Sequence, residues 1–215
     1  GGSRGIGFAI AEAFVMEGAN VSICSRSADS LATADAILKS HGTTVHSTIC
    51  DVSDPVALDE YIHMAHDTLT GLNVLVNNPS GVGITDNEDG WKLAVDVDLM
   101  ATVRGGWTAA PLIEQSGGGS IIHISSINAF TQSQGAAPYG AIKAALNHYT
   151  MTQAVDLAPK SIRVNAVAPG ATYFEGGTWG KMKTTNPKLY ESVLANIPSG
   201  RYGTPEEIAS VAVFL

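Results

Sequence analysis

Short apolar runs rich in β-branched residues alternate with longer stretches of helical periodicity along most of the chain. The runs expected as strands are 21–24, 43–50, 72–77, 120–125 and 161–167, and the stretches expected as helices are 7–17, 28–40, 54–69, 88–114 and 137–158. Most of these runs are too continuously apolar to leave one strand face in water. The alternation therefore predicts an α/β fold, with a doubly wound parallel sheet and right-handed crossovers.

The size and charge of the chain narrow the classes of protein to which it can belong. Its 215 residues fit one domain, 1–215, and 45% of them are hydrophobic, enough to fill one core. The formal net charge of −8 argues against nucleic acid or an anionic membrane as the main partner, because a phosphate-binding surface needs surplus Lys and Arg. No apolar run approaches the ~20 residues of a membrane span. Cys24 and Cys50 each end an apolar run, so we expect buried, reduced thiols in a cytoplasmic protein.

The first seven residues, Gly-Gly-Ser-Arg-Gly-Ile-Gly, form a glycine-rich loop that leads into a helical stretch. A loop of this kind at a helix N-terminus lets a diphosphate approach the backbone N–H groups. Gly1, Gly5 and Gly7 are spaced G-x-x-x-G-x-G, which differs from the common dinucleotide fingerprint, G-x-G-x-x-G. No lysine precedes Lys39, which excludes a P-loop. A tight turn without a ligand is the alternative, because glycine is common in turns.

Two arginines indicate which nicotinamide cofactor the loop would hold. An NAD enzyme presents an acidic residue to the ribose 2′-hydroxyl about 20 residues after the glycines, but here that position has Ser25 and Arg26. Arg26 and Arg4 can clamp a ribose 2′-phosphate, since guanidinium groups bind phosphate in a bidentate manner. The pattern predicts NADPH rather than NADH, and two solvated surface arginines are the alternative.

Tyr139 and Lys143 lie four residues apart and form the candidate catalytic pair. On a helix they share a face at ~5–6 Å, so the ammonium can lower the pKa of the phenol from ~10 toward neutrality. Such a tyrosine is a usable general acid for a carbonyl oxygen. Ser126 follows a predicted strand, at the sheet edge where ligands bind, and its hydroxyl can donate a hydrogen bond to a substrate carbonyl. Each signal is weak alone, and together they predict a catalytic site.

Two other pairs of polar residues carry weaker predictions. His63 and His66 have helical spacing but no accompanying ligands, so we expect surface histidines and no metal site. Asp96 and Asp98 are two residues apart, which places them on different sides of a helix rather than in one carboxylate pair.

The segment 171–200 mixes Gly, Pro and aromatic residues and breaks the regular alternation. Long irregular insertions in compact domains are often lids or binding loops, so we expect a substrate lid here. Its Tyr173, Phe174 and Trp179 either form an apolar wall over the site or pack the lid onto its own domain.

Several motifs occur in a characteristic order along the chain. They are GGSRGIG at the start, Cys50-Asp51-Val52, Asn77-Asn78, Ser126 with Tyr139 and Lys143, Asn165 to Gly170, and the closing GRYGTPEEIASVAVFL. This set resembles the short-chain dehydrogenase/reductase family, and within it the 3-oxoacyl-(acyl-carrier-protein) reductases. The resemblance covers essentially the whole chain and implies a Rossmann-type sheet in a single domain.

The resemblance also implies a role for each motif residue. Tyr139 would protonate the carbonyl oxygen, Ser126 would polarise it, and Lys143 would lower the pKa of the tyrosine and hold the nicotinamide ribose. The implied cofactor contacts are Gly1, Ser3, Arg4, Gly5, Ile6, Gly7 and Arg26 at the diphosphate and adenosine end, Asp51 and Val52 at the adenine, Asn78 with Pro79 and Ser80 at the ribose, and Pro169, Gly170 and Thr172 at the nicotinamide. The cofactor supplies the hydride chemistry.

The chain departs from the family pattern in three places. Pro79-Ser80 replaces Ala-Gly, and Pro79 removes a backbone donor. Asp98 replaces the helix asparagine of the family's proton relay; its main-chain carbonyl can still hold a relay water, while its charge alters the relay and the pH optimum. The family's first strand precedes the glycine loop and a final strand follows the position of Leu215, so we expect both to lie outside these 215 residues.

These features together predict an NADPH-dependent reductase of ketones or 3-oxoacyl thioesters. The resemblance implies a homotetramer or homodimer, formed through the helices that carry Asp98 and Tyr139. Two alternatives stay open: an NAD(P)-dependent alcohol dehydrogenase of the same family, and a catalytically silent dinucleotide-binding regulator. The departures at Asp98 and Pro79 motivate the second alternative, and the intact Ser126, Tyr139 and Lys143 count against it.

Overall fold

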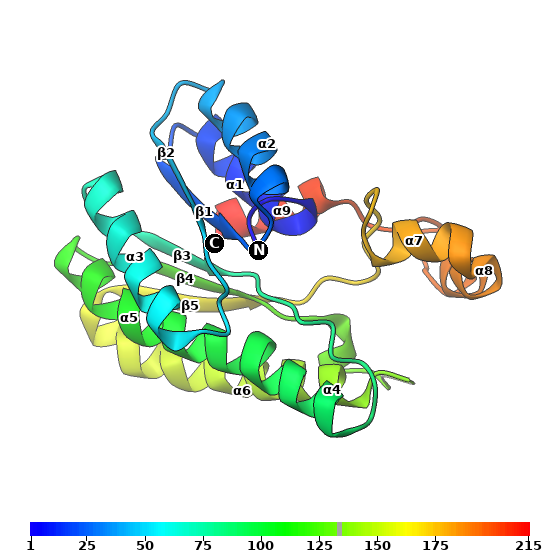
Figure 1. The fold of residues 1–215 in the computed structure, drawn as a ribbon. Helices are drawn as coiled ribbons and strands as arrows, with labels where there is room; N and C mark the ends of the chain where they lie inside the picture. The colour runs from blue at the N-terminus through cyan, green and yellow to red at the C-terminus, as the bar shows by residue number, and fades with distance from the viewer. Residues whose placement is uncertain (133–134) are drawn as a thin grey trace.

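A computed structural model describes residues 1–132 and 135–215 and has the predicted α/β architecture (Figure 1). The strands are β1 (Val21–Ser25), β2 (Val45–Ile49), β3 (Val74–Asn77), β4 (Gly119–Ile124) and β5 (Ile162–Val167). Each lies within two residues of a predicted apolar run, which confirms the strand predictions. All the pairings in the described chain are parallel: β1 with β2, and β4 with both β3 and β5.

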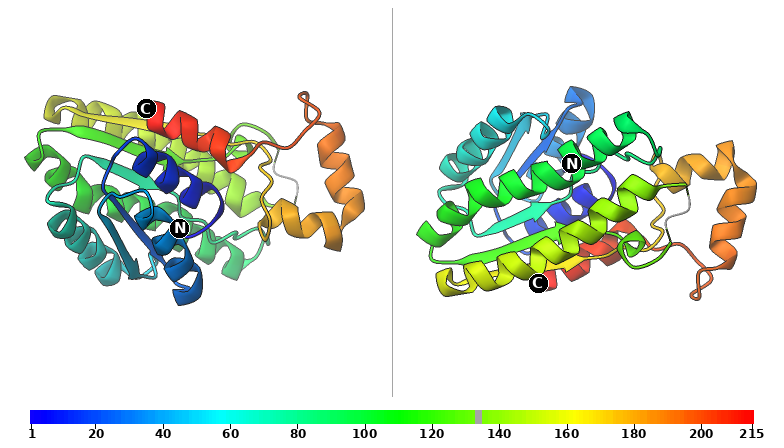
Figure 2. Two further views of the ribbon diagram at one scale, coloured as in Figure 1. Left: turned by 90° about the horizontal axis from the view of Figure 1, so that it is seen from above. Right: turned by 90° about the horizontal axis from the view of Figure 1, so that it is seen from below.

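The described strands form two parallel sheets, β1–β2 and β3–β4–β5, and helices cover both faces of this strand layer (Figures 1 and 2). They are α1 (Gly5–Met16), α2 (Ala28–Lys39), α3 (Pro55–Leu69), α4 (Glu88–Leu93), α5 (Ala101–Gln115), α6 (Ala137–Leu157), α7 (Thr178–Thr185), α8 (Pro187–Ala195) and α9 (Pro205–Phe214), with a π-helix η1 (Ala94–Met100) and 3₁₀ turns η2 (Ile127–Ala129) and η3 (Ala158–Lys160). On β4, Ile121 packs toward α3 and α5, whereas Ile122 and Ile124 pack toward α1 and α9. Burial on both sides explains why the isoleucines of β4 occupy both faces of the strand.

The edges of β1 and β3 face each other across a cavity of about 370 Å³. Val21 and Ile23 line it from one side and Val74 and Val76 from the other, and the glycine loop closes one end. The cavity lies beside the glycine loop.

Two stretches differ from the predicted elements, and α9 lies where no helix was predicted. The expected helix 88–114 is divided into α4, the π-helix η1 and α5, because η1 widens the helix around the buried Asp98. The segment 171–200 is not irregular throughout, since it contains α7 and α8 joined at Asn186, which caps the start of α8 through its side chain. These two helices project from the body of the molecule (Figures 1 and 2).

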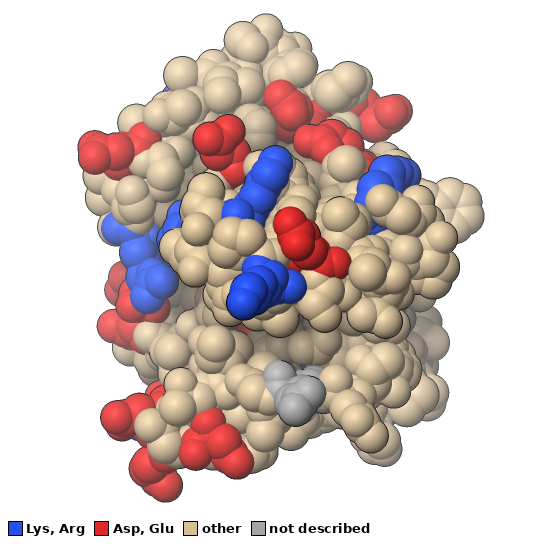
Figure 3. Space-filling model, turned by 90° about the vertical axis from the view of Figure 1, so that its right-hand side faces the viewer, with Lys and Arg blue, Asp and Glu red and all other residues tan. Residues whose placement is uncertain are grey.

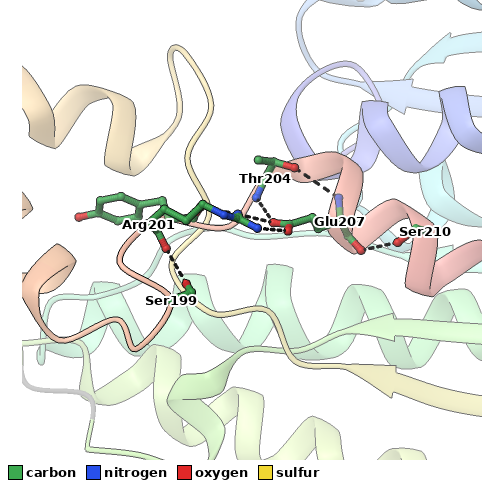
Figure 4. A network of polar contacts seen from close by, with 6 residues as sticks. Ser199, Arg201, Thr204, Glu207 and Ser210 are labelled. Atoms are coloured by element: carbon green, nitrogen blue, oxygen red, sulfur yellow. Dashed lines mark hydrogen bonds and ion pairs between the residues drawn. The ribbon is translucent and has the colours of Figure 1, made fainter.

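A polar network fixes the chain where it returns from this segment to the body (Figure 4). The hydroxyl of Thr204 accepts from the backbone N–H of Glu207 and the Glu207 carboxylate accepts from the N–H of Thr204, forming a capping box at the start of α9. Arg201 binds Glu207 through both guanidinium nitrogens. The pKa of Glu207 is lowered to about 2, chiefly by Arg201 and then by the N–H of Thr204. The projecting helices are therefore tied to α9.

In the described residues, we find no helix whose length and apolar character suit a membrane crossing.

Candidate active site

The predicted catalytic residues meet at the carboxyl ends of the central strands. Ser126 follows β4, while Tyr139 and Lys143 occupy the first turns of α6, which packs along β5 and η2. The backbone N–H of Ile127 donates to the carbonyl of Pro169 at 3.0 Å, so the loops after β4 and β5 are joined. The structure thus brings three residues from two elements to the edge where ligands bind in such sheets.

The hydroxyl of Ser126 lies near the phenol of Tyr139 and lowers its pKa. The hydroxyl oxygen of Ser126 also accepts from the backbone N–H of Asn128 at 3.2 Å, which caps the short turn η2. Ser126 is buried, and this capping contact fixes its position. The hydroxyls of the predicted polarising residue and the predicted acid are therefore adjacent.

Lys143 is buried with only 2% of its surface exposed. Its Nζ donates to the carbonyl of Ile124 at 3.1 Å and lies 3.3 Å from Oδ1 of Asp98. The same atom lies 5.6 Å from the ring centroid of Tyr139. Burial lowers the pKa of Lys143, and the charge of Asp98 opposes this effect. The ammonium therefore has Asp98 as its ionic partner and Tyr139 as a neighbour.

The pKa of Tyr139 is raised above its usual value, contrary to the expected lowering by Lys143. Burial is the largest cause, the charge of Asp98 adds to it, and the hydrogen bond with Ser126 acts in the opposite direction. Because Lys143 is paired with Asp98, its positive charge is largely compensated near the phenol. The phenol therefore keeps its proton at neutral pH.

Asp98 is fully buried in η1. Its Oδ2 accepts from the backbone N–H of Gly81 at 2.8 Å, and its main-chain carbonyl accepts from the hydroxyl of Thr102 at 3.0 Å. Asp96 lies on the surface and pairs with Lys92 at 2.7 Å. The two aspartates therefore point to different sides, as predicted, and it is the Asp98 carboxylate that contacts the catalytic residues.

The glycine loop forms a close turn at the start of α1. The N–H groups of Gly1 and Gly2 both donate to the carbonyl of Cys24 at 3.1 Å, and Nδ2 of Asn78 donates to the carbonyl of Gly1 at 3.1 Å. Gly5 has a φ of 55°, a left-handed conformation that favours glycine. A Cβ on Gly7 would lie 1.9 Å from the carbonyl oxygen of Gly1. The loop has no room for side chains at these positions, as a diphosphate cradle requires.

Replacing Gly7 by alanine should weaken dinucleotide binding about tenfold or more, because the added methyl group must displace the loop backbone at a cost of about 1–3 kcal/mol. Calorimetric titration with NADPH measures this loss. Gly203→Ala is the matched control, since its added Cβ would meet only ordinary contacts, the nearest at 3.6 Å. Unchanged affinity in Gly7→Ala would show that the loop does not hold the cofactor.

The two arginines proposed to select the cofactor are exposed near the same loop. The hydroxyl of Ser3 contacts that of Ser30 at 3.0 Å, so the loop adjoins the start of α2, just after Arg26. In the described chain neither Arg4 nor Arg26 pairs with a carboxylate. The pKa of Asp51 is lowered, first by hydrogen bonds from Ser53 and to a smaller degree by Arg26. Both guanidinium groups are thus free to bind an anion.

The remaining predicted cofactor residues lie on the loops around this site. Pro79 borders the cavity, and Ser80 accepts from the N–H of Val82 at 3.3 Å. Thr172 forms a bridge with Gly203 and donates to the carbonyl of Gly170 at 3.1 Å. Ile6 and Val52 pack partly against the core clusters, so their side chains also serve the core.

The aromatic residues of the segment 171–200 have different surroundings. A Cβ on Gly5 would lie 2.4 Å from the ring of Phe174, so this ring rests on the glycine loop. Tyr173 stands edge-on to Tyr190, while Trp179 packs against Tyr202. Phe174 therefore faces the site, and Tyr173 and Trp179 hold the segment together.

A buried polar network behind the site was missed by sequence reasoning. Nδ1 of His123 contacts Nδ2 of Asn77 at 3.2 Å, and its Nε2 contacts Oε1 of Gln153 at 2.9 Å. Burial lowers the pKa of His123 to about 4, so this histidine is neutral. The contacts join β3, β4 and α6. They thereby fix the position of α6, the helix that carries Tyr139 and Lys143. Polar residues inside an apolar strand were the one signal that could have indicated it.

The described residues contain no cluster of His, Cys, Asp and Glu suited to a metal ion, and His63 is exposed beside Asp59. Figure 3 shows the side that carries α7 and α8, where Lys and Arg side chains are interspersed with acidic ones. This side lacks the continuous basic surface that nucleic-acid binding needs.

Comparison with protein families and curated relatives gives consistent matches over the whole chain. A family model described as enoyl-(acyl carrier protein) reductase matches residues 1–215. Human dehydrogenase/reductase SDR family member 4 is 34% identical over 216 residues, which cover 98% of this chain and 77% of the relative. Isoepoxydon dehydrogenase patN of Penicillium expansum is 33% identical over 220 residues, 100% of this chain and 85% of the relative.

Solved structures share the same fold. A 7α-hydroxysteroid dehydrogenase complexed with NADH and 7-oxo glycochenodeoxycholic acid has a TM-score of 0.92 and 29% identity, covering 100% of this chain and 84% of the other. L-Sorbose reductase from Gluconobacter frateurii, complexed with NADPH and L-sorbose, has a TM-score of 0.91 and 31% identity, covering 100% and 86%. One of these neighbours was solved with NADH and the other with NADPH.

Proposed function

Because the chain belongs to the short-chain dehydrogenase/reductase family, we propose that it is an NADPH-dependent reductase of ketones or 3-oxoacyl thioesters. The observation that carries this proposal is the position of the Lys143 ammonium, 5.6 Å from the ring centroid of Tyr139, with Ser126 near the same phenol. The group is positioned at the strand ends, where a small-molecule substrate would bind. The relatives and neighbours named above are dehydrogenases and reductases.

The residues of the cradle fit a nicotinamide dinucleotide. Gly1, Gly5 and Gly7 form the close turn at the N-terminus of α1, where a diphosphate would lie. Arg4 and Arg26 would hold a 2′-phosphate at the adenosine end, Asp51 and Val52 would adjoin the adenine, and Asn78 the ribose. When bound, the nicotinamide supplies the hydride that reduces the substrate carbon.

The chain's own residues would handle the proton. Tyr139 donates the phenolic proton to the carbonyl oxygen, and Ser126 donates a hydrogen bond to the same oxygen. The raised pKa of Tyr139 keeps this proton in place at neutral pH, which favours reduction over alcohol oxidation there. Lys143 would hold the nicotinamide ribose from its position beneath the tyrosine.

The test is a panel of carbonyl compounds and alcohols assayed with NADPH and NADH by nicotinamide absorbance. Reduction of ketones or 3-oxoacyl thioesters with NADPH supports the proposal. Turnover confined to alcohols would assign the alcohol dehydrogenase alternative. Dinucleotide binding with no turnover of any compound would assign the catalytically silent alternative.

We also propose a homotetramer or homodimer formed through α5 and α6. Trp107 on α5 is 63% exposed, and Met151 and Val155 on α6 are 63% and 74% exposed. Large apolar side chains gathered on neighbouring helices favour burial against another copy. Sedimentation of the protein measures the assembly.

The free, buried thiols of Cys24 and Cys50 support a reducing, cytoplasmic location.

A further inference from the structure

The Asp98 carboxylate joins the catalytic lysine to the loop that follows β3. Its Oδ2 accepts from the N–H of Gly81 at 2.8 Å, and its Oδ1 lies 3.3 Å from Nζ of Lys143. Asp98 is 0% exposed and Lys143 is 2% exposed. A buried pair of this kind is far less screened than a surface pair, so its charges act strongly on neighbouring groups.

The two oxygens of the carboxylate have different surroundings. Oδ2 is satisfied by Gly81, whereas Oδ1 has no hydrogen bond among the described residues and meets Lys143 only as an ionic partner. Removal of the Asp98 charge would therefore leave Lys143 as an uncompensated buried charge. Asp98 is thus an integral part of the charge arrangement around Tyr139.

We propose that Asp98 is a positioning residue whose negative charge holds the Lys143 ammonium at the end of β4 and keeps the proton on Tyr139. This proposal rests on the proposed function, because it concerns the same proton. The effect on the pKa of Tyr139 has the matching sign, since the charge of Asp98 raises it. The site thereby favours proton donation by Tyr139. The pH at which alcohol oxidation reaches half of its maximal rate is raised accordingly.

In the described residues, few other charges face the group formed by Asp98, Lys143 and Tyr139. On α6, Lys143 and Tyr139 are the titratable neighbours, and on η1 it is Asp98 itself. From β4, His123 is held neutral between Asn77 and Gln153, with a pKa of about 4. Asp96 is on the surface with Lys92. Removing the Asp98 charge therefore changes one dominant interaction.

Asp98→Asn tests the proposal, because an amide oxygen can still accept from Gly81 while the charge is lost. Alcohol oxidation needs a deprotonated Tyr139, so its kcat rises with pH as this group ionises. We expect the midpoint of that rise to move to lower pH in Asp98→Asn. The high-pH decline of carbonyl reduction should move in the same direction. A merely structural role would lower the melting temperature and leave both midpoints in place.

Asp96→Asn is the matched control, since it removes a carboxylate from the same π-helix at the surface. It should leave the pH profile unchanged. Asp98→Glu is the second variant, which keeps the charge and should keep the midpoint near that of the wild type even where kcat falls. Equal midpoints in the wild type and Asp98→Asn, or a glutamate variant whose midpoint drops, would overturn the inference.

A failure of the proposed function and a failure of the role of Asp98 give different results. If the wild type turns over neither carbonyls nor alcohols, the proposed function fails. If the wild type is active and the asparagine variant has the wild-type pH profile, only the role of Asp98 fails.

Discussion

Replacing Tyr139 by phenylalanine should reduce carbonyl reduction by about 10²- to 10⁴-fold, the usual contribution of a general acid, while NADPH affinity changes little. The phenolic proton is lost, but the ring keeps its place beside Lys143 and Ser126. Single-turnover measurement of NADPH oxidation separates this chemical step from binding. Calorimetric titration with NADPH checks that the cofactor site is intact.

Tyr149→Phe is a matched control from the same helix. The Tyr149 hydroxyl accepts from Gln153 at 3.1 Å, and this variant should retain most of the activity. Turnover in Tyr139→Phe equal to that of the wild type would rule out Tyr139 as the proton donor. Loss of NADPH binding in this variant would instead assign the tyrosine a mainly structural role.

Arg26→Asp should shift the ratio of kcat/KM for NADPH to that for NADH toward NADH by about 10- to 100-fold. A charge-assisted hydrogen bond contributes about 1.5–3 kcal/mol, and an aspartate at this position would also repel the 2′-phosphate. The same carboxylate could accept from the 2′-hydroxyl of NADH. Initial rates with both cofactors at varied concentrations measure the ratio.

The control for this change is Lys188→Asp, which alters the net charge equally on the exposed surface of α8. It should leave the cofactor ratio unchanged. A wild-type ratio in Arg26→Asp would remove Arg26 from the phosphate clamp and leave Arg4 as the remaining candidate.

The sequence was most informative where structure depends on local pattern. The apolar run that became β4 lies between two helical layers, so Ile121, Ile122 and Ile124 are all buried and the strand was recognisable. The spacing of Tyr139 and Lys143 correctly placed them on one face of α6, because a helix fixes that geometry. The glycine loop was likewise recognisable from its composition.

Three helices, α7, α8 and α9, were not predicted, although local start signals were present for two of them. Asn186 before Pro187 caps α8, and Thr204 before Pro205 begins a capping box for α9. The many glycine and aromatic residues of 171–200 obscured the first signal. In such segments, capping residues therefore indicate the start of a helix better than the overall composition does.

The features that could not be predicted depend on contacts between distant parts of the chain. The π-helix η1 has no sequence signature, and its Asp98 is fixed by Gly81 and by Lys143. The pKa of Tyr139 rises rather than falls because burial and the charge of Asp98 outweigh the opposite effect of Ser126. Neither effect can be read from the spacing of Tyr139 and Lys143 alone.

The most direct test of the central claim follows the hydride itself. NADPH carrying deuterium at the transferable position of the nicotinamide is incubated with the protein and the best carbonyl substrate from the panel. Mass spectrometry of the product should find one deuterium on the carbinol carbon, and Tyr139→Phe should yield almost no labelled alcohol. An alcohol without the label, or labelled alcohol formed equally by Tyr139→Phe, would contradict hydride transfer at the Ser126, Tyr139 and Lys143 site.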